Sequence, residues 1–210
     1  MEYLIFGCIA YLLGSVPTAV WVGKSYYKID IREHGSKNAG ATNTFRVLGK
    51  KPGIIVLCVD IMKGALAVLL PYFILGETLE RHHMIHIELI CALMAVIGHV
   101  FPLFAGFRGG KGVATSLGVI IGLHPPAAFI CLGLFLVVFI VSKYVSLGAI
   151  TAAIAFPLLI IFYFKSDSFW LNVFSIILSA VVIFAHRKNI GRLVKGTEGK
   201  MSLFKKSESV

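Results

Sequence analysis

Seven runs of apolar residues follow one another along the chain, and they constrain the fold more than any other feature. A helix needs about 20 apolar residues to cross the roughly 30 Å hydrocarbon layer of a bilayer. Of the 210 residues, 58% are hydrophobic, so little is left for a soluble domain. We predict an all-α, polytopic membrane protein of about seven transmembrane helices, with residues 1–210 as one domain. The apolar runs are 3–23, 53–76, 84–106, 113–123, 127–141, 146–164 and 169–185.

The fourth run is short, and only His124-Pro125-Pro126 separates it from the fifth. Proline removes a backbone donor and clashes with the preceding turn, so this pair predicts a helix break. The first run lacks a positively charged segment before it. We therefore expect it to remain as an uncleaved span.

The distribution of Lys and Arg predicts the orientation, since cytoplasmic loops carry an excess of both. With the N-terminus outside, the inner segments hold 17 of the 20 basic residues. The C-terminus is then cytoplasmic, and the polar segments share one membrane face. These inner segments are 24–52, 107–112, 142–145 and 186–210.

The net charge of +10 does not indicate a nucleic-acid binder, because the basic residues lie in short loops between apolar runs. Membrane lipids with anionic head groups and an anionic substrate are the expected partners. The sequence leaves the oligomeric state open, with a monomer as the simplest expectation.

The first polar segment mixes glycines, hydroxyls, amides and cations. Glycine allows close backbone approach to a ligand, and the other side chains can donate hydrogen bonds to phosphate oxygens. The alternative is a solvated turn in which Gly and Asn serve turn geometry alone. The candidate ligands are Gly35, Ser36, Asn38, Gly40, Thr42, Asn43 and Arg46.

The second polar segment is a glycine-rich turn that opens directly into an apolar run. Free amides at a helix start, together with two cations, form a potential anion site. The alternative is a basic turn that only obeys the orientation rule. The candidates are Arg108, Gly109, Gly110, Lys111 and Gly112.

The third polar segment follows the last apolar run and contains His186 and Asn189, with Glu198 further on. On a continuing helix His186 and Asn189 share a face. A basic tail bound to anionic lipid would explain the neighbouring Lys and Arg residues, but not these two.

Several polar residues lie outside these segments. Asp60 and Lys63 stand one turn apart inside the second run, where we favour a mutual ion pair bridging helices over a substrate role. His99 precedes the glycine-rich turn, and we expect it either to hydrogen-bond another helix or to support residues that bind the substrate. A metal site at the outer histidines is disfavoured, and no metal or cofactor is expected. These histidines are His82, His83 and His86.

Taken together, the motifs resemble bacterial acyl-phosphate:glycerol-3-phosphate acyltransferase over nearly the whole chain. The resemblance implies a seven-helix fold in the bacterial inner membrane with a cytoplasmic active site. It also implies transfer of a fatty acyl group from acyl phosphate to the 1-hydroxyl of glycerol 3-phosphate. The products are lysophosphatidic acid and phosphate, in the first step of phospholipid synthesis. The motifs are Gly35-Ser36 through Ala41-Thr42-Asn43 with Arg46, Gly98-His99-Val100-Phe101-Pro102 through Gly109-Gly110-Lys111-Gly112-Val113-Ala114-Thr115, and His186-Arg187-Lys188-Asn189-Ile190 with Glu198.

The same resemblance implies roles for single residues. Glu198 matches a structural position, and Arg108 stands where relatives often carry Lys. The other matched positions bind substrate, among them the glycines beside Lys111. The residues implied to be catalytic are Ser36, Arg46, Lys111, His186 and Asn189.

The residues also constrain the mechanism. None of the seven histidines has an Asp five positions later, the spacing used by thioester-dependent acyltransferases. Of the carboxylates, only Asp30, Glu33 and Glu198 adjoin the motifs. We therefore expect catalysis by positioning and by charge stabilisation, with a substrate phosphate as proton acceptor and Ser36 orienting a substrate oxygen.

Two other functional classes compete with this interpretation. The short helix pair expected around 113–141 resembles the discontinuous helices of organic-phosphate carriers. Against a carrier, the sequence has no internal repeat, and its polar motifs cluster at one membrane face instead of the midplane. A membrane scaffold without catalytic activity would leave the glycine and amide clusters unexplained.

Overall fold

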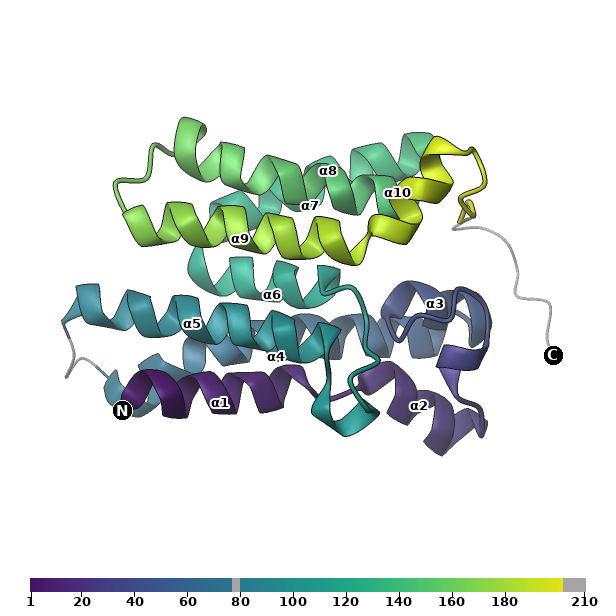
Figure 1. Cartoon of the computed structure of the whole chain (residues 1–210), viewed down its shortest axis with the longest axis horizontal. Coiled ribbons are helices and arrows are strands. Elements are labelled where there is room, and N and C mark those ends of the chain that lie inside the picture. Colours follow the sequence, from purple (N-terminus) through teal and green to yellow (C-terminus); the bar gives the residue numbers. More distant parts are fainter. Residues whose placement is uncertain (77–79, 202–210) are drawn as a thin grey trace.

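The computed structural model describes residues 1–76 and 80–201, and every regular element within those ranges is helical (Figure 1). This confirms the all-α prediction. A π-helical turn at Leu159–Tyr163 continues the eighth helix. The helices are α1 (Glu2–Gly14), α2 (Thr18–Tyr27), α3 (Ala41–Val47), α4 (Lys50–Leu75), α5 (Arg81–Val100), α6 (Val113–Leu123), α7 (Pro125–Ser142), α8 (Val145–Leu158), α9 (Phe169–Ala185) and α10 (Arg187–Val194).

Five helical segments of the described chain are long and apolar enough to cross a membrane, and α9 with α10 forms a sixth if this pair, bent by 61°, is one span. Helix α6 has 11 residues, which at 1.5 Å per residue gives about 16 Å, too short for a full crossing. A count of seven crossings therefore stays a prediction. The five segments are Glu2–Tyr27, Lys50–Leu75, His82–Ala105, Pro125–Ser142 and Val145–Tyr163.

The first apolar run lies within the candidate span Glu2–Tyr27, which the structure divides into two helices. Helix α1 ends at Gly14 and α2 begins at Thr18, with Pro17 preceding it. Proline has no amide to continue the hydrogen-bond ladder, so carbonyls at this break need other donors. One donor comes from another helix, because Lys63 Nζ donates to the backbone oxygen of Val16 at 2.9 Å.

Glycines bring two helix pairs into backbone contact. Gly14 and Gly98 lie between α1 and α5, and Gly64 and Gly118 lie between α4 and α6. A Cβ at any of these four positions would overlap backbone atoms of the facing helix. In lipid, where apolar burial does not drive helices together, such close packing is a main source of association.

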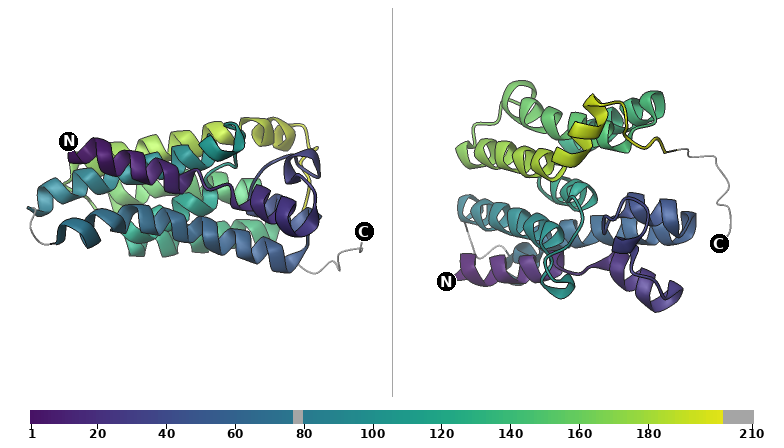
Figure 2. Two further views of the ribbon diagram at one scale, coloured as in Figure 1. Left: turned by 90° about the horizontal axis from the view of Figure 1, so that it is seen from below. Right: turned by 45° about the vertical axis from the view of Figure 1, so that its right-hand side comes forward.

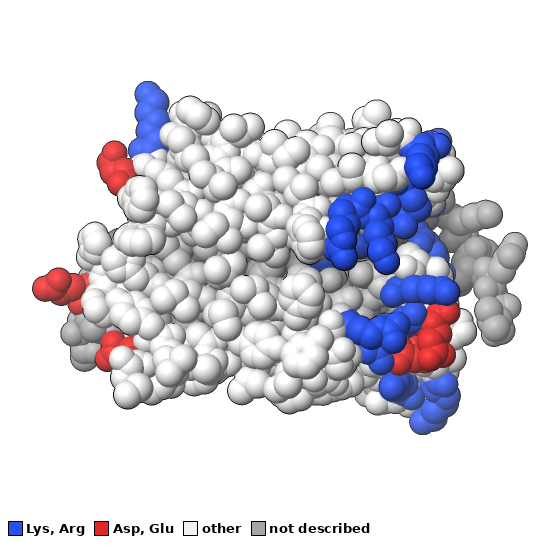
Figure 3. Space-filling model, viewed as in Figure 1, with Lys and Arg blue, Asp and Glu red and all other residues white. Residues whose placement is uncertain are grey.

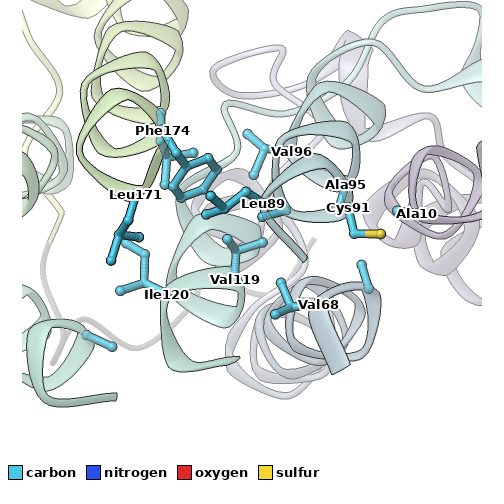
Figure 4. Packing of buried hydrophobic residues seen from close by; sticks show 14 of the residues in the cluster. Ala10, Val68, Leu89, Cys91, Ala95, Val96, Val119, Ile120, Leu171 and Phe174 are labelled. Atoms are coloured by element: carbon cyan, nitrogen blue, oxygen red, sulfur yellow. The ribbon is translucent and has the colours of Figure 1, made fainter. Parts of the chain in front are cut away.

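The helices form two groups that lie side by side, α1, α4, α5 and α6 in one and α7, α8 and α9 in the other (Figures 1 and 2). Apolar side chains join them, and Figure 4 shows Phe174 and Leu171 of α9 beside Leu89 of α5 and Ile120 of α6. The N-terminus lies at one end of the molecule, whereas α2, α3 and α10 lie at the other (Figure 1). Most of the visible Lys and Arg side chains gather at this second end (Figure 3).

Candidate active site

A cavity of about 790 Å³ lies between the two helix groups, and all three polar segments contribute to its wall. The structure thus brings together residues that are separated by up to 164 positions in the sequence. The polar residues lining it include Gly35, Ser36, Asn38, Gly40, Thr42, Asn43, Arg46, Lys111, Gly112, His186, Asn189 and Glu198.

Most of the remaining cavity wall is apolar and extends between the helices. Its side chains come from α4, α6, α7, α8 and α9, so the polar end continues into a space suited to a hydrocarbon chain. These side chains include Leu57, Ile61, Leu117, Ile120, Cys131, Leu132, Phe135, Ala149, Phe156, Leu178 and Val182.

Asn43 fixes the loop that carries Ser36. Its Nδ2 donates to the backbone oxygens of Ile31 at 2.9 Å and His34 at 3.0 Å. Its Oδ1 accepts from the backbone amide of Ser36 at 2.8 Å. Gly35 has φ +58°, and a Cβ there would overlap Asn43 Oδ1, so this position requires glycine. The Asn43 amide is thus engaged by the protein backbone, while Ser36 lines the cavity and is exposed.

The first polar segment is partly helical, because α3 begins after Gly40 and carries Thr42, Asn43 and Arg46. Arg46 is exposed and lines the cavity. A Cβ built on Gly199 would lie 3.7 Å from Arg46 Nη2, so the chain after α10 passes directly beside this guanidinium. The first and third polar segments therefore close the same end of the cavity.

Arg32 is a residue that the sequence analysis did not single out. Its Nε and Nη2 donate to the two carboxylate oxygens of Asp30 at 2.9 and 2.7 Å, and its Nη1 donates to the backbone oxygen of Ala105 at 2.7 Å. It thus ties the first polar segment to the turn before the second. The hydrogen bonds from Arg32 hold the pKa of Asp30 well below its usual range, so this carboxylate is a poor proton acceptor.

The glycine-rich turn separates into a part that packs against α5 and a part that lines the cavity. Gly109 and Gly110 lie against His99 so closely that a Cβ on either would overlap it. Neither glycine is among the residues that line the cavity, and neither is the exposed Arg108. Their assignment to substrate stays a prediction, whereas Lys111 does line the cavity.

Lys111 is partly buried, and burial is the main cause that lowers its pKa to about 8. Glu198 raises this pKa, while the positive charges of Arg192 and Arg46 lower it further. Helix α6 begins directly after Gly112, which has φ 81°. The first amides of a helix have no partner within it, so a cation and free amides lie together here.

His186 occupies the bend between α9 and α10. Its Nδ1 lies 2.8 Å from the backbone oxygen of Val182, a contact in which Nδ1 must carry the proton. In the neutral ring Nε2 is then a free acceptor. Burial is the main cause that lowers the pKa of His186 to about 4, with a further contribution from Lys111, so the ring is neutral at physiological pH.

Glu198 gathers the residues around it. Its Oε1 accepts from Ser146 Oγ at 2.7 Å and from Asn189 Nδ2 at 2.6 Å, and its Oε2 accepts from Arg192 Nε at 2.6 Å. The structural role expected for Glu198 stays a prediction. Asn189 Oδ1 is buried and has no partner within the described residues. With Nδ2 held by Glu198, this oxygen is available to a donor in the cavity.

Comparison with known proteins agrees with this arrangement. The glycerol-3-phosphate acyltransferase family model matches residues 4–196. The chain belongs to the glycerol-3-phosphate acyltransferase family. Glycerol-3-phosphate acyltransferase from Listeria monocytogenes is 48% identical, covering 96% of this chain and 98% of the relative. The same enzyme from Chlorobaculum tepidum is 42% identical, covering 99% of this chain and 100% of the relative.

Solved structures show the same architecture. The crystal structure of PlsY (YgiH), an integral membrane glycerol 3-phosphate acyltransferase, in its glycerol 3-phosphate form has a TM-score of 0.86 and 35% identity, over 98% of this chain and 100% of that one. Its lysophosphatidic acid form has a TM-score of 0.83. This member of the glycerol-3-phosphate acyltransferase family is thus an all-helical integral membrane acyltransferase. Membership of this family argues against the two alternatives, a carrier and a scaffold without catalytic activity.

A fourth carboxylate adjoins the site of this acyltransferase, and the sequence analysis did not count it. Asp60 of α4 lines the cavity, as does His99 of α5. The expected ion pair with Lys63 is confirmed, since Asp60 Oδ1 lies 2.8 Å from Lys63 Nζ. In the sequence, Asp60 lies inside an apolar run and away from the three motifs. Its contact with the cavity depends on how α4 packs, which the sequence does not show.

The outer histidines lie on α5 at the end opposite the cavity's polar residues. His83 Nε2 lies 3.0 Å from the hydroxyl of Tyr3, which links α5 to α1. The rings of His82 and His86 are 5.0 Å apart. Among the described residues, no three His, Cys, Asp or Glu side chains are grouped as metal ligands would be. The three histidines therefore contribute contacts between helices and rings.

Proposed function

We propose that this acyltransferase transfers a fatty acyl group from acyl phosphate to the 1-hydroxyl of glycerol 3-phosphate, giving lysophosphatidic acid and phosphate. The observation that carries the proposal is the single cavity whose polar end holds cations and amides and whose other end is apolar. An acyl phosphate has the same two parts in the same order. Glycerol 3-phosphate is small and entirely polar, so it fits the polar end alone.

The charges suit two phosphates and a developing oxyanion. Arg46 and Lys111 line the polar end together with Arg192. Cations and free amides of a helix start bind phosphate by charge-assisted hydrogen bonds. Aimed at a reacting carbonyl, such donors also stabilise the negative charge that builds up on its oxygen. We assign Lys111, Gly112 and the start of α6 to the acyl phosphate, and Arg46 with Ser36 and Thr42 to orienting the substrates.

The reaction forms a bond between the 1-oxygen of glycerol 3-phosphate and the acyl carbon, and breaks the bond between that carbon and the bridging oxygen of the phosphate. His186 Nε2 and Asn189 Oδ1 are acceptors, and either can accept the hydrogen bond of the attacking hydroxyl before its proton is transferred. With a pKa of about 4, His186 is a weaker base than a phosphate, whose second pKa is about 6. The hydroxyl proton therefore passes to the departing phosphate, and His186 orients the hydroxyl.

Acyl phosphate is the proposed donor because it brings its own proton acceptor to the site. Of the carboxylates named above, Asp30, Asp60 and Glu198 are each held by donors or cations of the protein, and Glu33 does not line the cavity. A thioester donor has a sulfur leaving group and would need a protein base at this place. Neither a metal nor a cofactor has a part in the proposed reaction.

The proposed location is the bacterial inner membrane, with about seven crossings, the N-terminus outside and the C-terminus cytoplasmic. The charge distribution supports this orientation, since the cavity's polar residues lie at the end of the molecule where Lys and Arg gather (Figure 3). Under the rule for cytoplasmic loops, that end faces the cytoplasm. Both substrates would then reach the site from the cytoplasm or the inner leaflet.

The test is turnover by the purified protein in detergent or nanodiscs. Acyl phosphate and glycerol 3-phosphate should yield lysophosphatidic acid and one equivalent of phosphate in the presence of a chelator. Acyl-CoA as sole donor, freed of contaminating acyl phosphate, should give no product. Robust turnover with acyl-CoA would falsify the assignment of the donor.

A further inference from the structure

A buried charged cluster joins the broken first span to α4 and α5. Asp60 Oδ1 lies 2.8 Å from Lys63 Nζ and accepts a hydrogen bond from Thr18 Oγ1 at 3.2 Å. Lys63 Nζ also donates to the backbone oxygen of Val16 at the break. His99 brings its Nδ1 to 3.7 Å from the same oxygen of Asp60. One carboxylate thus faces groups from α2, α4 and α5.

The same cluster supports the glycines that precede Lys111. The backbone amide of Gly110 donates to the backbone oxygen of His99 at 3.1 Å. The His99 ring fills the space where a side chain on Gly110 would stand, and the His99 carbonyl does the same for Gly109. The path of the chain just before Lys111 is therefore set by the place of His99.

Stability alone does not account for this cluster. Ionisable side chains inside a membrane span are costly, and a buried ion pair contributes little beyond what apolar side chains of similar volume would give. Asp60, Lys63 and His99 are nevertheless 2%, 6% and 6% exposed. Hydrogen bonds and the ion pair fix the positions of Asp60 and Lys63, and the buried His99 ring packs beside them.

We propose that His99, buried beside Asp60 in this cluster, is a positioning residue that sets the depth of Lys111 in the cavity. It acts through the backbone of Gly110, and we propose no contact between His99 and the substrates. The inference rests on the proposed function, since it concerns the lysine assigned to the acyl phosphate. It predicts that changes at His99 alter the surroundings of Lys111 and not only the amount of folded protein.

The decisive measurement is the pKa of Lys111 itself, obtained from competitive amine labelling and peptide mass spectrometry. Burial sets this value at about 8, and Glu198, Arg192 and Arg46 are the charged groups that also act on it. If His99→Ala releases the turn toward water, the pKa moves up toward the ordinary 10.5, and kcat with acyl phosphate falls about tenfold or more. His99→Gln, which keeps a polar side chain of similar length, should restore most of both.

His83→Ala is the matched control. It is the same substitution on the same helix, and it also removes a contact between helices, the one to Tyr3. It lies at the opposite end of α5 from Lys111. We expect it to lower the melting temperature without moving the pKa of Lys111.

A second experiment tests the contact between the His99 ring and Gly110. Gly110→Ala alone should push the turn away and lower kcat about a hundredfold, because its methyl group overlaps the ring. In the double variant His99→Ala/Gly110→Ala the ring is gone, so the alanine should add little to the loss caused by His99→Ala. If the loss in kcat of the double variant equals the product of the two single losses, the His99 ring does not determine the path of the turn.

The outcomes separate this inference from the proposed function. A Lys111 pKa that stays at its wild-type value in folded His99→Ala protein overturns the positioning role, whatever the activity. A wild-type protein that does not use acyl phosphate overturns the proposed function. The labelling result and the melting curves are read without turnover, so each failure can be recognised alone.

Discussion

Asn189 Nδ2 lies 2.6 Å from Glu198 Oε1, and this contact decides which way the Asn189 amide faces. The carboxylate can only accept, so the nitrogen of the amide points to it and Oδ1 is left for a donor in the cavity. Glu198 lies beyond α10, in the chain that closes over the site. The orientation of a proposed substrate ligand therefore depends on a residue nine positions away.

Removal of this carboxylate should impair catalysis more than its neutralisation. Glu198→Ala leaves Asn189 free to flip and Arg192 unpaired, and we expect kcat/KM to fall by about 10- to 100-fold. Glu198→Gln retains an acceptor oxygen for Asn189 and should cost less than about fivefold. Steady-state kinetics on both variants, with melting curves as a check of folding, measure the difference. Equal losses in the two would mean that the charge, and not the orientation, is what counts.

The pH profile should report Lys111. In the protein without bound substrate, Lys111 has a pKa of about 8. Its charged form is the one that binds phosphate. Activity is therefore present below pH 8 and should fall as pH rises through that value in kcat/KM. A bound phosphate favours the charged lysine, so the corresponding fall in kcat should come at higher pH. His186 is neutral above pH 4 and should contribute no inflection near 6.5.

Lys111→Ala should lower kcat/KM by roughly tenfold to a few hundredfold, because a charge-assisted hydrogen bond contributes about 1.5–3 kcal/mol. Arg108→Ala is the matched comparison, a cation in the same turn that does not line the cavity. It should change kcat/KM by less than about threefold. A loss at Arg108 as large as that at Lys111 would return Arg108 to the substrate site.

The orientation can be measured with single cysteines in a background that lacks Cys8, Cys58, Cys91 and Cys131. Position 82 should react with an impermeant thiol reagent added outside intact cells, and position 195 only after the membrane is opened. The reason is the charge distribution, with 17 of 20 Lys and Arg in the segments assigned to the inside. The reverse pattern would place the cavity's polar end outside the cell.

The length of the apolar runs predicted the helical segments. The distribution of Lys and Arg predicted which loops lie at the same end of the molecule, and hence that the three polar segments converge. The contacts within the site could not be predicted in this way. Arg32 bonds to Ala105 across 73 positions, and Lys63 to Val16 across 47. Such pairs depend on how helices pack, on which a single sequence carries no signal.

The same limit explains why two glycines were assigned to substrate on grounds that the structure does not favour. In sequence, Gly109 and Gly110 are indistinguishable from Gly112 as places where a backbone can approach a phosphate. In the structure, the His99 backbone oxygen packs against Gly109 and the His99 ring packs against Gly110, so this space is not open to a phosphate. The signal that could have been used is the His99 side chain itself, polar and at the end of an apolar run.

Ser36 provides the last prediction, on whether the acyl group is transferred directly. It is exposed, and a hydrogen bond from its backbone amide to Asn43 Oδ1 holds its loop. No base is paired with its hydroxyl among the described residues. A serine without a base is a poor nucleophile, but it can orient a substrate oxygen. We therefore expect direct transfer, and a loss of activity in Ser36→Ala without a trapped intermediate. Rapid quench with labelled acyl phosphate and no glycerol 3-phosphate decides the point. Label bound to Ser36, formed and discharged at the rate of turnover, would establish a ping-pong route instead.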